Sequence, residues 1–385
     1  MKNKLFVYTA VFFSFVLLLV GCKDPYNPVL KYQKTNFLIV EGYIDGAAPT
    51  QFMLSRSRAL TGKDTEPKIV EKGARVAVED DKNNQNWLIE TGNGGYSSIG
   101  TLNLNPSNKY RIHIYTKDGG EYTSDFVAFK SSPAIDKIGF KIKEGTGDAQ
   151  IYVNTHDASG ATKYYRWEYD QTWEFHTLYE TRLKYDGLTK KVIDRTDAVR
   201  ICWRDASLNR ILINNSTKLT EDRIDEMPLV LIPNHSQQLS VLYSIKVKQY
   251  ALDVNAFNFW EAMKKNTEEV GSIFDPQPNQ TMGNIHSVKD INEPVVGYVS
   301  AGNSYSQRVF IKNSDVPSSW NSYPDCPQII VPNIKDSVEF YFGSGQYLPI
   351  NTFLMDGGRE GYTAAYPACV DCTIFGTNVK PVFWP

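Results

Sequence analysis

The sequence predicts a mainly β protein: an N-terminal Ig-like or transthyretin-like β-sandwich, followed by a larger β-sandwich domain. Tyr and Phe are abundant, at 23 and 19 residues, and together with Val, Ile and Thr they favour pleated, half-buried strands. Apolar and polar residues also alternate with a period of two along many short segments, which are separated by Gly, Pro, Asn and Asp. We expect one inserted helix and an irregular, disulfide-tied C-terminal tail.

Residues 1–21 have the order of a lipoprotein signal peptide. Basic residues precede an apolar run from Leu5 to Val20, and Leu19-Val20-Gly21-Cys22 follows the lipobox pattern. A retained transmembrane helix is the alternative. However, the run is shorter than the roughly 20 residues that span a bilayer, and Lys23-Asp24-Pro25 contains no basic stop-transfer cluster. We therefore expect cleavage before Cys22 and lipidation of its sulfur.

The first sandwich is expected over residues 37–130. Residues 22–36 form a lipid anchor and tether before it, since Pro25 and Pro28 favour extended backbone. Ser131-Ser132-Pro133 marks the boundary, because Pro breaks a strand ladder. The alternation predicts strands over residues 37–44, 51–57, 74–80, 87–89 and 110–115.

The larger sandwich is expected over residues 131–385, around a long strand from Lys163 to Thr177. One face of this strand carries Tyr165, Trp167 and Tyr169, and the other carries Tyr164, Arg166, Glu168 and Asp170. The aromatic face fits a core, with a sugar-stacking platform as the alternative. Further strands are expected over residues 138–142, 150–153, 199–203, 211–213, 229–232, 242–247, 295–300, 308–311 and 338–342.

One helix is expected over residues 254–270. Apolar residues such as Ala256, Phe259 and Trp260 recur there at steps of three and four, after Asp253 as the candidate N-cap. Gly271 ends the helix, because glycine adopts the left-handed cap conformation without strain. After residue 342 the sequence is rich in Gly, Pro and isolated aromatic residues, which predicts an irregular tail.

Four cysteines besides Cys22 remain in the chain: Cys202, Cys326, Cys369 and Cys372. An even number in an exported protein predicts two disulfide bonds, and three pairings are possible. A four-thiolate zinc site is the competing hypothesis, because Cys369 and Cys372 have the spacing of half a ligand set. Cys202 and Cys326 lie far apart in the sequence and form no second close pair, so disulfide bonds are favoured.

No complete catalytic or metal-binding motif occurs in the sequence. The histidines lack the His-Glu-x-x-His spacing, and both a Gly-x-Ser-x-Gly elbow and a phosphate-binding glycine loop are absent. Glu174 and His176 share a strand face, but two groups are too few to hold a metal. We predict no catalytic residues, no metal and no cofactor. The histidines are His113, His156, His176, His235 and His286.

Several motifs occur along the mature chain: Leu38-Ile39-Val40-Glu41-Gly42-Tyr43, Tyr164-Tyr165-Arg166-Trp167, Cys202-Trp203, Tyr243-Ser244-Ile245, Phe259-Trp260, Gly271-Ser272-Ile273-Phe274-Asp275-Pro276, Gly283-Asn284-Ile285, Gly297-Tyr298 and Cys369-Val370-Asp371-Cys372. Together they resemble the Bacteroidota lipoprotein family catalogued as domain of unknown function four-two-four-nine. The resemblance implies an outer-membrane lipoprotein, often encoded beside a TonB-dependent transporter, with β-sandwich modules and no established catalytic residues. Lys23-Asp24 also resembles the start of a surface-export signal, which favours the cell exterior over the periplasmic face.

Two functional hypotheses follow. The first is a non-catalytic surface subunit that binds a TonB-dependent transporter, with a glycan or peptide as a further ligand. The second is a surface hydrolase of glycans or peptides, whose acidic residues converge only in the fold and so leave no sequence motif. Nucleic acid is excluded as a partner, because the net charge of -2 and the pI of about 6.3 provide no basic surplus.

Overall fold

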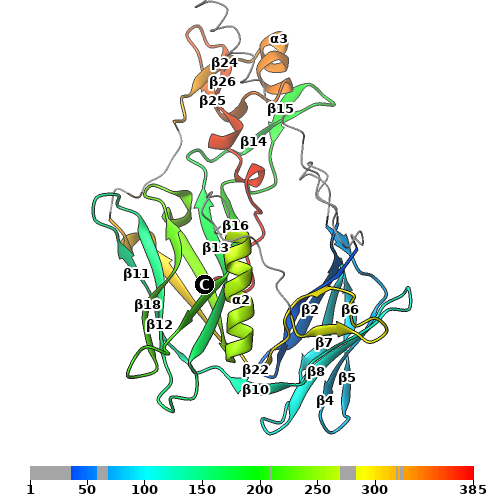
Figure 1. Ribbon diagram of the computed structural model, residues 1–385. Coiled ribbons are helices and arrows are strands. Elements are labelled where there is room, and N and C mark those ends of the chain that lie inside the picture. The colour runs from blue at the N-terminus through cyan, green and yellow to red at the C-terminus, as the bar shows by residue number, and fades with distance from the viewer. Residues whose placement is uncertain (1–35, 59–67, 209, 269–282, 318–319, 321–324) are drawn as a thin grey trace, which may run out of the picture.

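The computed structural model describes residues 36–58, 68–208, 210–268, 283–317, 320 and 325–385. Cys22, the signal peptide, most of the tether and the predicted helix end at Gly271 lie outside these residues. Figure 1 shows three bodies: a sandwich built mainly from the N-terminal part, a second sandwich, and a smaller C-terminal sheet. The predicted mainly β fold is therefore confirmed.

The strands of the first half of the chain are β1 (Leu38–Asp45), β2 (Pro49–Arg56), β3 (Ile69–Val70), β4 (Arg75–Asp80), β5 (Gln85–Trp87), β6 (Ile89–Gly92), β7 (Gly95–Thr101), β8 (Lys109–Tyr115), β9 (Glu121–Ser124), β10 (Val127–Ser131), β11 (Ile135–Ile142), β12 (Ala149–His156), β13 (Tyr164–His176), β14 (Leu183–Asp186) and β15 (Lys191–Asp194). The strands of the second half are β16 (Ile201–Ser207), β17 (Leu212–Asn215), β18 (Arg223–Ile232), β19 (Leu242–Leu252), β20 (Ile285–Ser287), β21 (Val295–Val296), β22 (Ala301–Asn303), β23 (Tyr305–Lys312), β24 (Ile329–Pro332), β25 (Leu348–Leu354) and β26 (Glu360–Ala365). The helices are α2 (Val254–Glu268), α3 (Lys335–Val338), the π-helical turn η4 (Glu339–Gly343), and the short turns η1 (Gln237–Leu239), η2 (Asn313–Asp315), η5 (Pro367–Cys369) and η6 (Cys372–Ile374).

The first sandwich recruits strands from far along the chain. β1 pairs with β2, and β8 pairs with both β4 and β9. Strands β20, β21 and β22 then join β9, β1 and β10, so residues 285–303 complete a sandwich that the sequence places over residues 37–130. The approach of β22 to β10 is so close that a Cβ on Gly302 would lie 1.6 Å from the Lys130 carbonyl oxygen. Only glycine fits there.

The second sandwich packs the sheet β16-β13-β19-β23 against the sheet β11-β12-β18. Tyr165, Trp167 and Tyr169 point from β13 into this core, where their exposed fractions are 0%, 0% and 7%. The aromatic face of β13 is therefore core, and the alternative of a sugar-stacking platform is wrong. The opposite face of β13 is left for solvent and for the neighbouring sandwich.

The C-terminal region is more ordered than the sequence predicts. β25 and β24 flank β26 in a three-stranded sheet, beside the hairpin β14–β15. The strand predicted over residues 338–342 is wrong: these residues lie in α3 and η4, where Val338 and Phe342 pack against Val331 and Tyr362. A short segment of mostly apolar residues does not distinguish a strand from a buried helical turn.

Helix α2 begins where the sequence predicts. The Asp253 carboxylate accepts a hydrogen bond of 2.7 Å from the backbone N–H of Ala256, which caps the N-terminus. Ala256, Phe257 and Phe259 are buried, and Phe257 packs against Tyr164 of β13. None of the helices in the described residues combines the length and apolar character that crossing a membrane requires.

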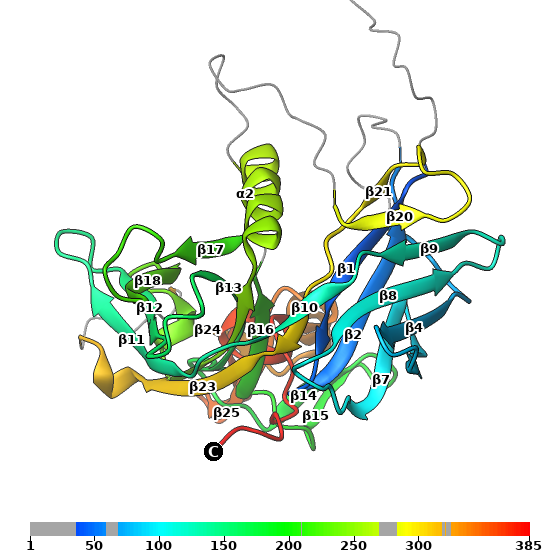
Figure 2. The same cartoon turned by 60° about the horizontal axis from the view of Figure 1, so that its bottom comes forward.

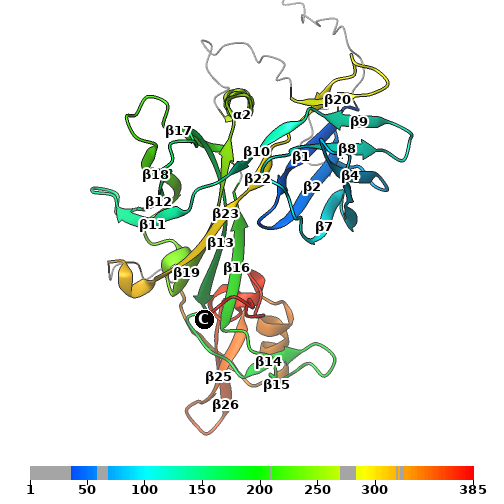
Figure 3. The same cartoon turned by 90° about the horizontal axis from the view of Figure 1, so that it is seen from below.

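Within the described residues, two direct connections lead from the first sandwich into the second: β10 continues into β11, and β22 continues into β23. Figure 2 shows the first of them. Seen from below, the C-terminal sheet lies at one end of β13 and α2 lies at the other (Figure 3). The outer face of the sheet β16-β13-β19-β23 is therefore bounded by α2, by the first sandwich and by the C-terminal region.

Candidate functional site

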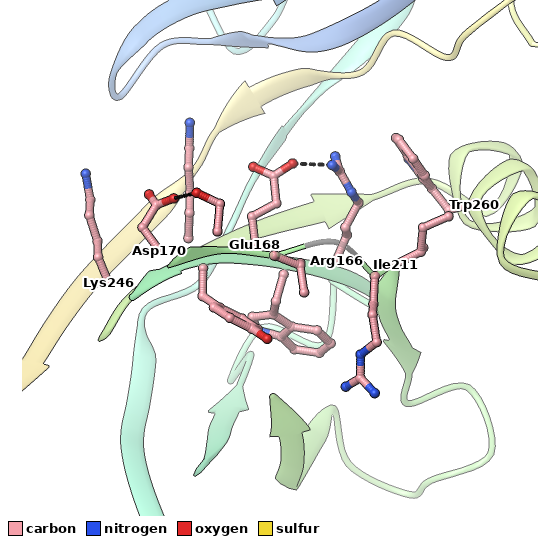
Figure 4. A pocket seen from close by; sticks show the side chains of 12 residues that line it. Arg166, Glu168, Asp170, Ile211, Lys246 and Trp260 are labelled. Atoms are coloured by element: carbon pink, nitrogen blue, oxygen red, sulfur yellow. Dashed lines mark hydrogen bonds and ion pairs between the residues drawn. The ribbon is translucent and has the colours of Figure 1, made fainter. Parts of the chain in front are cut away.

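The outer face of β13 and β19 forms the floor of an open cleft, which we call the charged cleft. Two adjoining hollows of about 360 and 550 Å³ make it up, and both contact Arg166, Glu168, Asp170, Lys246 and Lys248. Figure 4 shows that Arg166, Glu168, Asp170 and Lys246 project to the same side of the sheet, with Trp260 beside them from α2. The opposite wall is the β1–β2 hairpin, through residues such as Tyr43 and Gln51.

The sequence alternation places these charges on one face. β13 and β19 are antiparallel, and the register sets Asp170 opposite Lys246, and Glu168 opposite Lys248. Because side chains opposite each other in an antiparallel pair share a face, the floor has an acidic column on β13 beside a basic column on β19. Arg308 on β23 lies opposite Lys246 and extends the basic side.

Arg166 is held firmly at the α2 end of the charged cleft. Its guanidinium lies 4.0 Å from the Trp260 ring centroid and 5.2 Å from that of Tyr250. It also forms an ion pair with Glu168. The second oxygen of Glu168 accepts a hydrogen bond of 2.6 Å from the Tyr250 hydroxyl. Both oxygens of Glu168 are thus occupied by protein donors.

A second ion pair joins the two sandwiches. Lys248 on β19 lies 2.8 Å from a carboxylate oxygen of Asp45, which ends β1. Asp45 is buried, and it also accepts a hydrogen bond of 2.6 Å from the Ser304 hydroxyl and one of 2.9 Å from the Ala47 backbone N–H. Burial would raise the pKa of Asp45, but the bonds from Lys248 and Ser304 outweigh it and hold this pKa below its usual value.

Aromatic packing supports this contact. The rings of Tyr43 on β1 and Tyr250 on β19 lie 4.7 Å apart between centroids. Burial raises the pKa of both hydroxyls, and the nearby carboxylates of Asp45 and Glu168 add to the effect for Tyr43 and Tyr250 respectively. Both groups therefore stay neutral at physiological pH. The Tyr250 hydroxyl donates its hydrogen bond to Glu168, whereas the buried Tyr43 hydroxyl has no hydrogen-bond partner among the described residues.

The C-terminal residues cover the other end of the sheet face. Trp384 is 7% exposed and packs edge-on against Trp203 and Phe310. Its indole N–H donates a hydrogen bond of 2.8 Å to Glu174. Phe383 lies over the Arg308 guanidinium at 3.6 Å. The charged cleft is thus the part of this face that remains open between α2 and the chain end.

The four predicted cysteines form two disulfide bonds, Cys202–Cys372 and Cys326–Cys369. The prediction of disulfides is confirmed, and the zinc hypothesis is wrong because no thiolate remains among these four residues. Cys202–Cys372 ties the tail to β16, where an isolated bridge also pairs Trp203 with Thr377. Cys326–Cys369 closes the small core that contains Ile350 and Val370.

The histidines do not converge. His176 Nε2 lies 2.7 Å from a carboxylate oxygen of Glu174, and the His113 ring lies between Glu79 and Glu121, at 2.8 and 2.9 Å from their carboxylate oxygens. These carboxylates contact opposite nitrogens of the His113 ring, so no common point exists for a metal. In the described part of the chain, no group of three His, Cys, Asp or Glu residues could hold a metal ion.

The sequence predicts the charges of β13 on the floor of the charged cleft, but not their partners on β19 and β1. The period of two separates Arg166, Glu168 and Asp170 from the buried aromatic residues. Lys246 and Lys248 show the same alternation along β19, but nothing local reveals that β19 pairs with β13 in this register. No local pattern predicts the role of Asp45 in the cleft, because the side chains that bind it, Lys248 and Ser304, lie 203 and 259 positions away.

The family model described as Domain of unknown function (DUF4249) matches residues 23–308. The chain belongs to this family. The matched region contains the first sandwich and the second sandwich as far as β23, within which it ends, and it stops before the C-terminal sheet.

The solved structures with detectable similarity include one of fibronectin type III domains and one of α-2-macroglobulin. A segment of two fibronectin type III domains from chicken tenascin aligns at 13% identity and a TM-score of 0.17, over 56% of this chain and 92% of that one. A point mutant of α-2-macroglobulin from Salmonella aligns at 12% identity and a TM-score of 0.18, over 82% of this chain and 17% of that one. No curated protein matches the chain significantly.

Proposed function

We propose that this protein is a non-catalytic outer-membrane lipoprotein that serves as an accessory, binding subunit of a TonB-dependent transporter. The observation that carries the proposal is the charged cleft, where two sandwiches face each other and two of the acidic groups, Glu168 and Asp45, are already bonded to protein donors. Glu168 is held by Arg166 and Tyr250, and Asp45 by Lys248 and Ser304. Such fixed charges suit recognition, whereas a general acid or base needs a free position for its proton.

The location rests on the sequence. The lipobox ending at Cys22 supports a lipid anchor, and Lys23-Asp24 supports display at the cell exterior. The transporter partner rests on the family resemblance, which implies that proteins of this family are often encoded beside a TonB-dependent transporter. Exposed aromatic and apolar side chains such as Phe340 and Leu354, 65% and 71% exposed, offer contact area on the C-terminal sheet region.

The experiment is affinity purification of the tagged protein from outer membranes, followed by mass spectrometry. We expect stoichiometric recovery of one TonB-dependent transporter. A Cys22→Ser variant should leave the membrane fraction, because the acyl chains are then absent, and should recover no transporter from washed membranes. Recovery of the wild-type protein alone, under conditions that preserve other outer-membrane complexes, would contradict the proposal.

A further inference from the structure

One pair of charges in the charged cleft differs from the others. Asp170 and Lys246 lie directly opposite each other on β13 and β19, and both are exposed to the cleft. Among the described residues, Lys246 has no hydrogen-bond or ion-pair partner, and Asp170 accepts a single hydrogen bond, 3.2 Å from Ser207. Neighbouring charges on the same floor, Glu168 and Lys248, are engaged with other protein groups. Asp170 and Lys246 are therefore available to a ligand.

The spacing of Asp170 and Lys246 suits a ligand that carries both a positive and a negative charge. Adjacent strands lie roughly 4.8 Å apart, so the two side chains rise side by side from the floor. A free α-ammonium can donate to the carboxylate of Asp170 while a carboxylate accepts from Lys246 Nζ. Hydrogen bonds between ionised partners are the strong ones, and each is lost when the ligand charge is blocked. Figure 4 shows both side chains pointing into the open cleft.

Part of the adjoining wall is apolar, beside Arg166 and Arg210. Leu208, Ile211 and Trp260 are half-buried and line the same hollow of about 360 Å³ as Asp170 and Lys246. This volume is within the range of roughly 300–1,000 Å³ that small-ligand pockets occupy. An apolar side chain would therefore enter between β17 and α2, while the charged ends remain on the floor.

We propose that the charged cleft binds a small amino-acid-type zwitterion with an apolar side chain, such as a free apolar amino acid or a short apolar peptide. Asp170 holds its ammonium group, Lys246 holds its carboxylate, and Leu208, Ile211 and Trp260 contact its side chain. The inference deepens the proposed function, since it names the ligand class of the binding subunit.

The test is isothermal titration calorimetry of the purified full-length mature protein with leucine, leucyl-leucine, N-acetyl-leucyl-leucine and leucyl-leucine amide. We expect at least one of the two unblocked compounds, leucine or leucyl-leucine, to bind. If leucyl-leucine is the better ligand, each blocked dipeptide should bind at least about tenfold more weakly than leucyl-leucine. Leucine as the tighter ligand would assign the site to the free amino acid instead. Equal binding of blocked and unblocked dipeptides, or no binding of any compound at millimolar concentration, would overturn the inference.

Substitutions show which ligand group each of the two charged residues binds. Asp170→Asn should remove the preference for a free ammonium and keep the preference for a free carboxylate, and Lys246→Met should do the reverse. Asp225→Asn on β18 and Lys141→Met on β11 are matched controls away from the cleft, and both should bind as wild type does.

If the transporter co-purifies while no compound binds, this inference fails and the proposed function stands. If the zwitterion binds while no transporter co-purifies, the transporter partnership fails and the ligand site stands.

Discussion

Lys248 of the second sandwich lies 2.8 Å from the Asp45 carboxylate of the first. This contact connects the β1–β2 hairpin to the floor of the charged cleft, and Ser304 holds the same carboxylate from the crossover between β22 and β23. Three segments that are far apart in the sequence thus meet at one buried acid. This junction holds the β1–β2 hairpin beside the floor of the charged cleft.

Removing the cation should destabilise the protein. Lys248→Met leaves the Asp45 carboxylate buried without its counter-charge, which we expect to cost about 2 kcal/mol of unfolding free energy. Denaturant titration measures the change. Lys141→Met is the matched control, because it breaks an exposed ion pair with Glu226 and should leave stability as it is. Equal stabilities for both variants and wild type would show that Asp45 does not depend on Lys248.

The same junction should respond to acid. The pKa of Asp45 in the folded protein is below its usual value, so the ionised form favours folding. Its contribution is fully present above the unfolded-state pKa of about 3.9, and is lost as the pH falls through the lower folded pKa. The unfolding free energies of wild type and Asp45→Asn should therefore converge as the pH falls from 7 to 2. A difference that stays constant over that interval would contradict this assignment.

The disulfides should be complete and specific. Mass spectrometry of the non-reduced mature protein should find the peptide pairs Cys202–Cys372 and Cys326–Cys369, with no free thiol among these four cysteines. Replacing Cys326 and Cys369 together by Ala should cost about 3 kcal/mol, because the bond closes a loop across 43 positions. Thermal unfolding measures this loss. Pairing of Cys369 with Cys372 in the protein would refute the structure of the tail.

Trp384 should anchor the chain end. Trp384→Ala removes the buried ring that contacts Trp203 and Phe310, which should cost about 3 kcal/mol. Val382→Ala two positions earlier should have no effect, because Val382 is fully exposed. Denaturant titration compares the two variants. If both behave alike, the tail does not contribute to the stability of the sheet.

The sequence predicts the parts of the fold that depend on local pattern. The period of two locates most strands, including the division of β13 into buried aromatic and outward charged faces, and Asp253 marks the start of α2 correctly. Pairing over long distances leaves no local trace, so the addition of β20, β21 and β22 to the first sandwich is not predicted. For the same reason, four cysteines indicate two bonds but not which residues pair.

The candidate site, too, depends on contacts between distant segments that the sequence does not reveal. Arg166, Glu168 and Asp170 are identified as an outward face, yet a solvated strand face and a binding floor have the same pattern. What distinguishes them is the opposing hairpin with Asp45, which only the folded chain brings to Lys248. The π-helical turn of residues 339–343 escapes prediction because its short apolar run fits a strand equally well.

The protein is expected to bind its ligands in the charged cleft without altering them chemically. The most direct measurement is product analysis by mass spectrometry after the purified mature protein is incubated with glycans and with peptides, including leucyl-leucine. We predict that every compound is recovered intact, from wild type and from Glu168→Gln alike. A cleavage product that wild type forms and Glu168→Gln or Asp170→Asn does not form would contradict the account and establish a surface hydrolase.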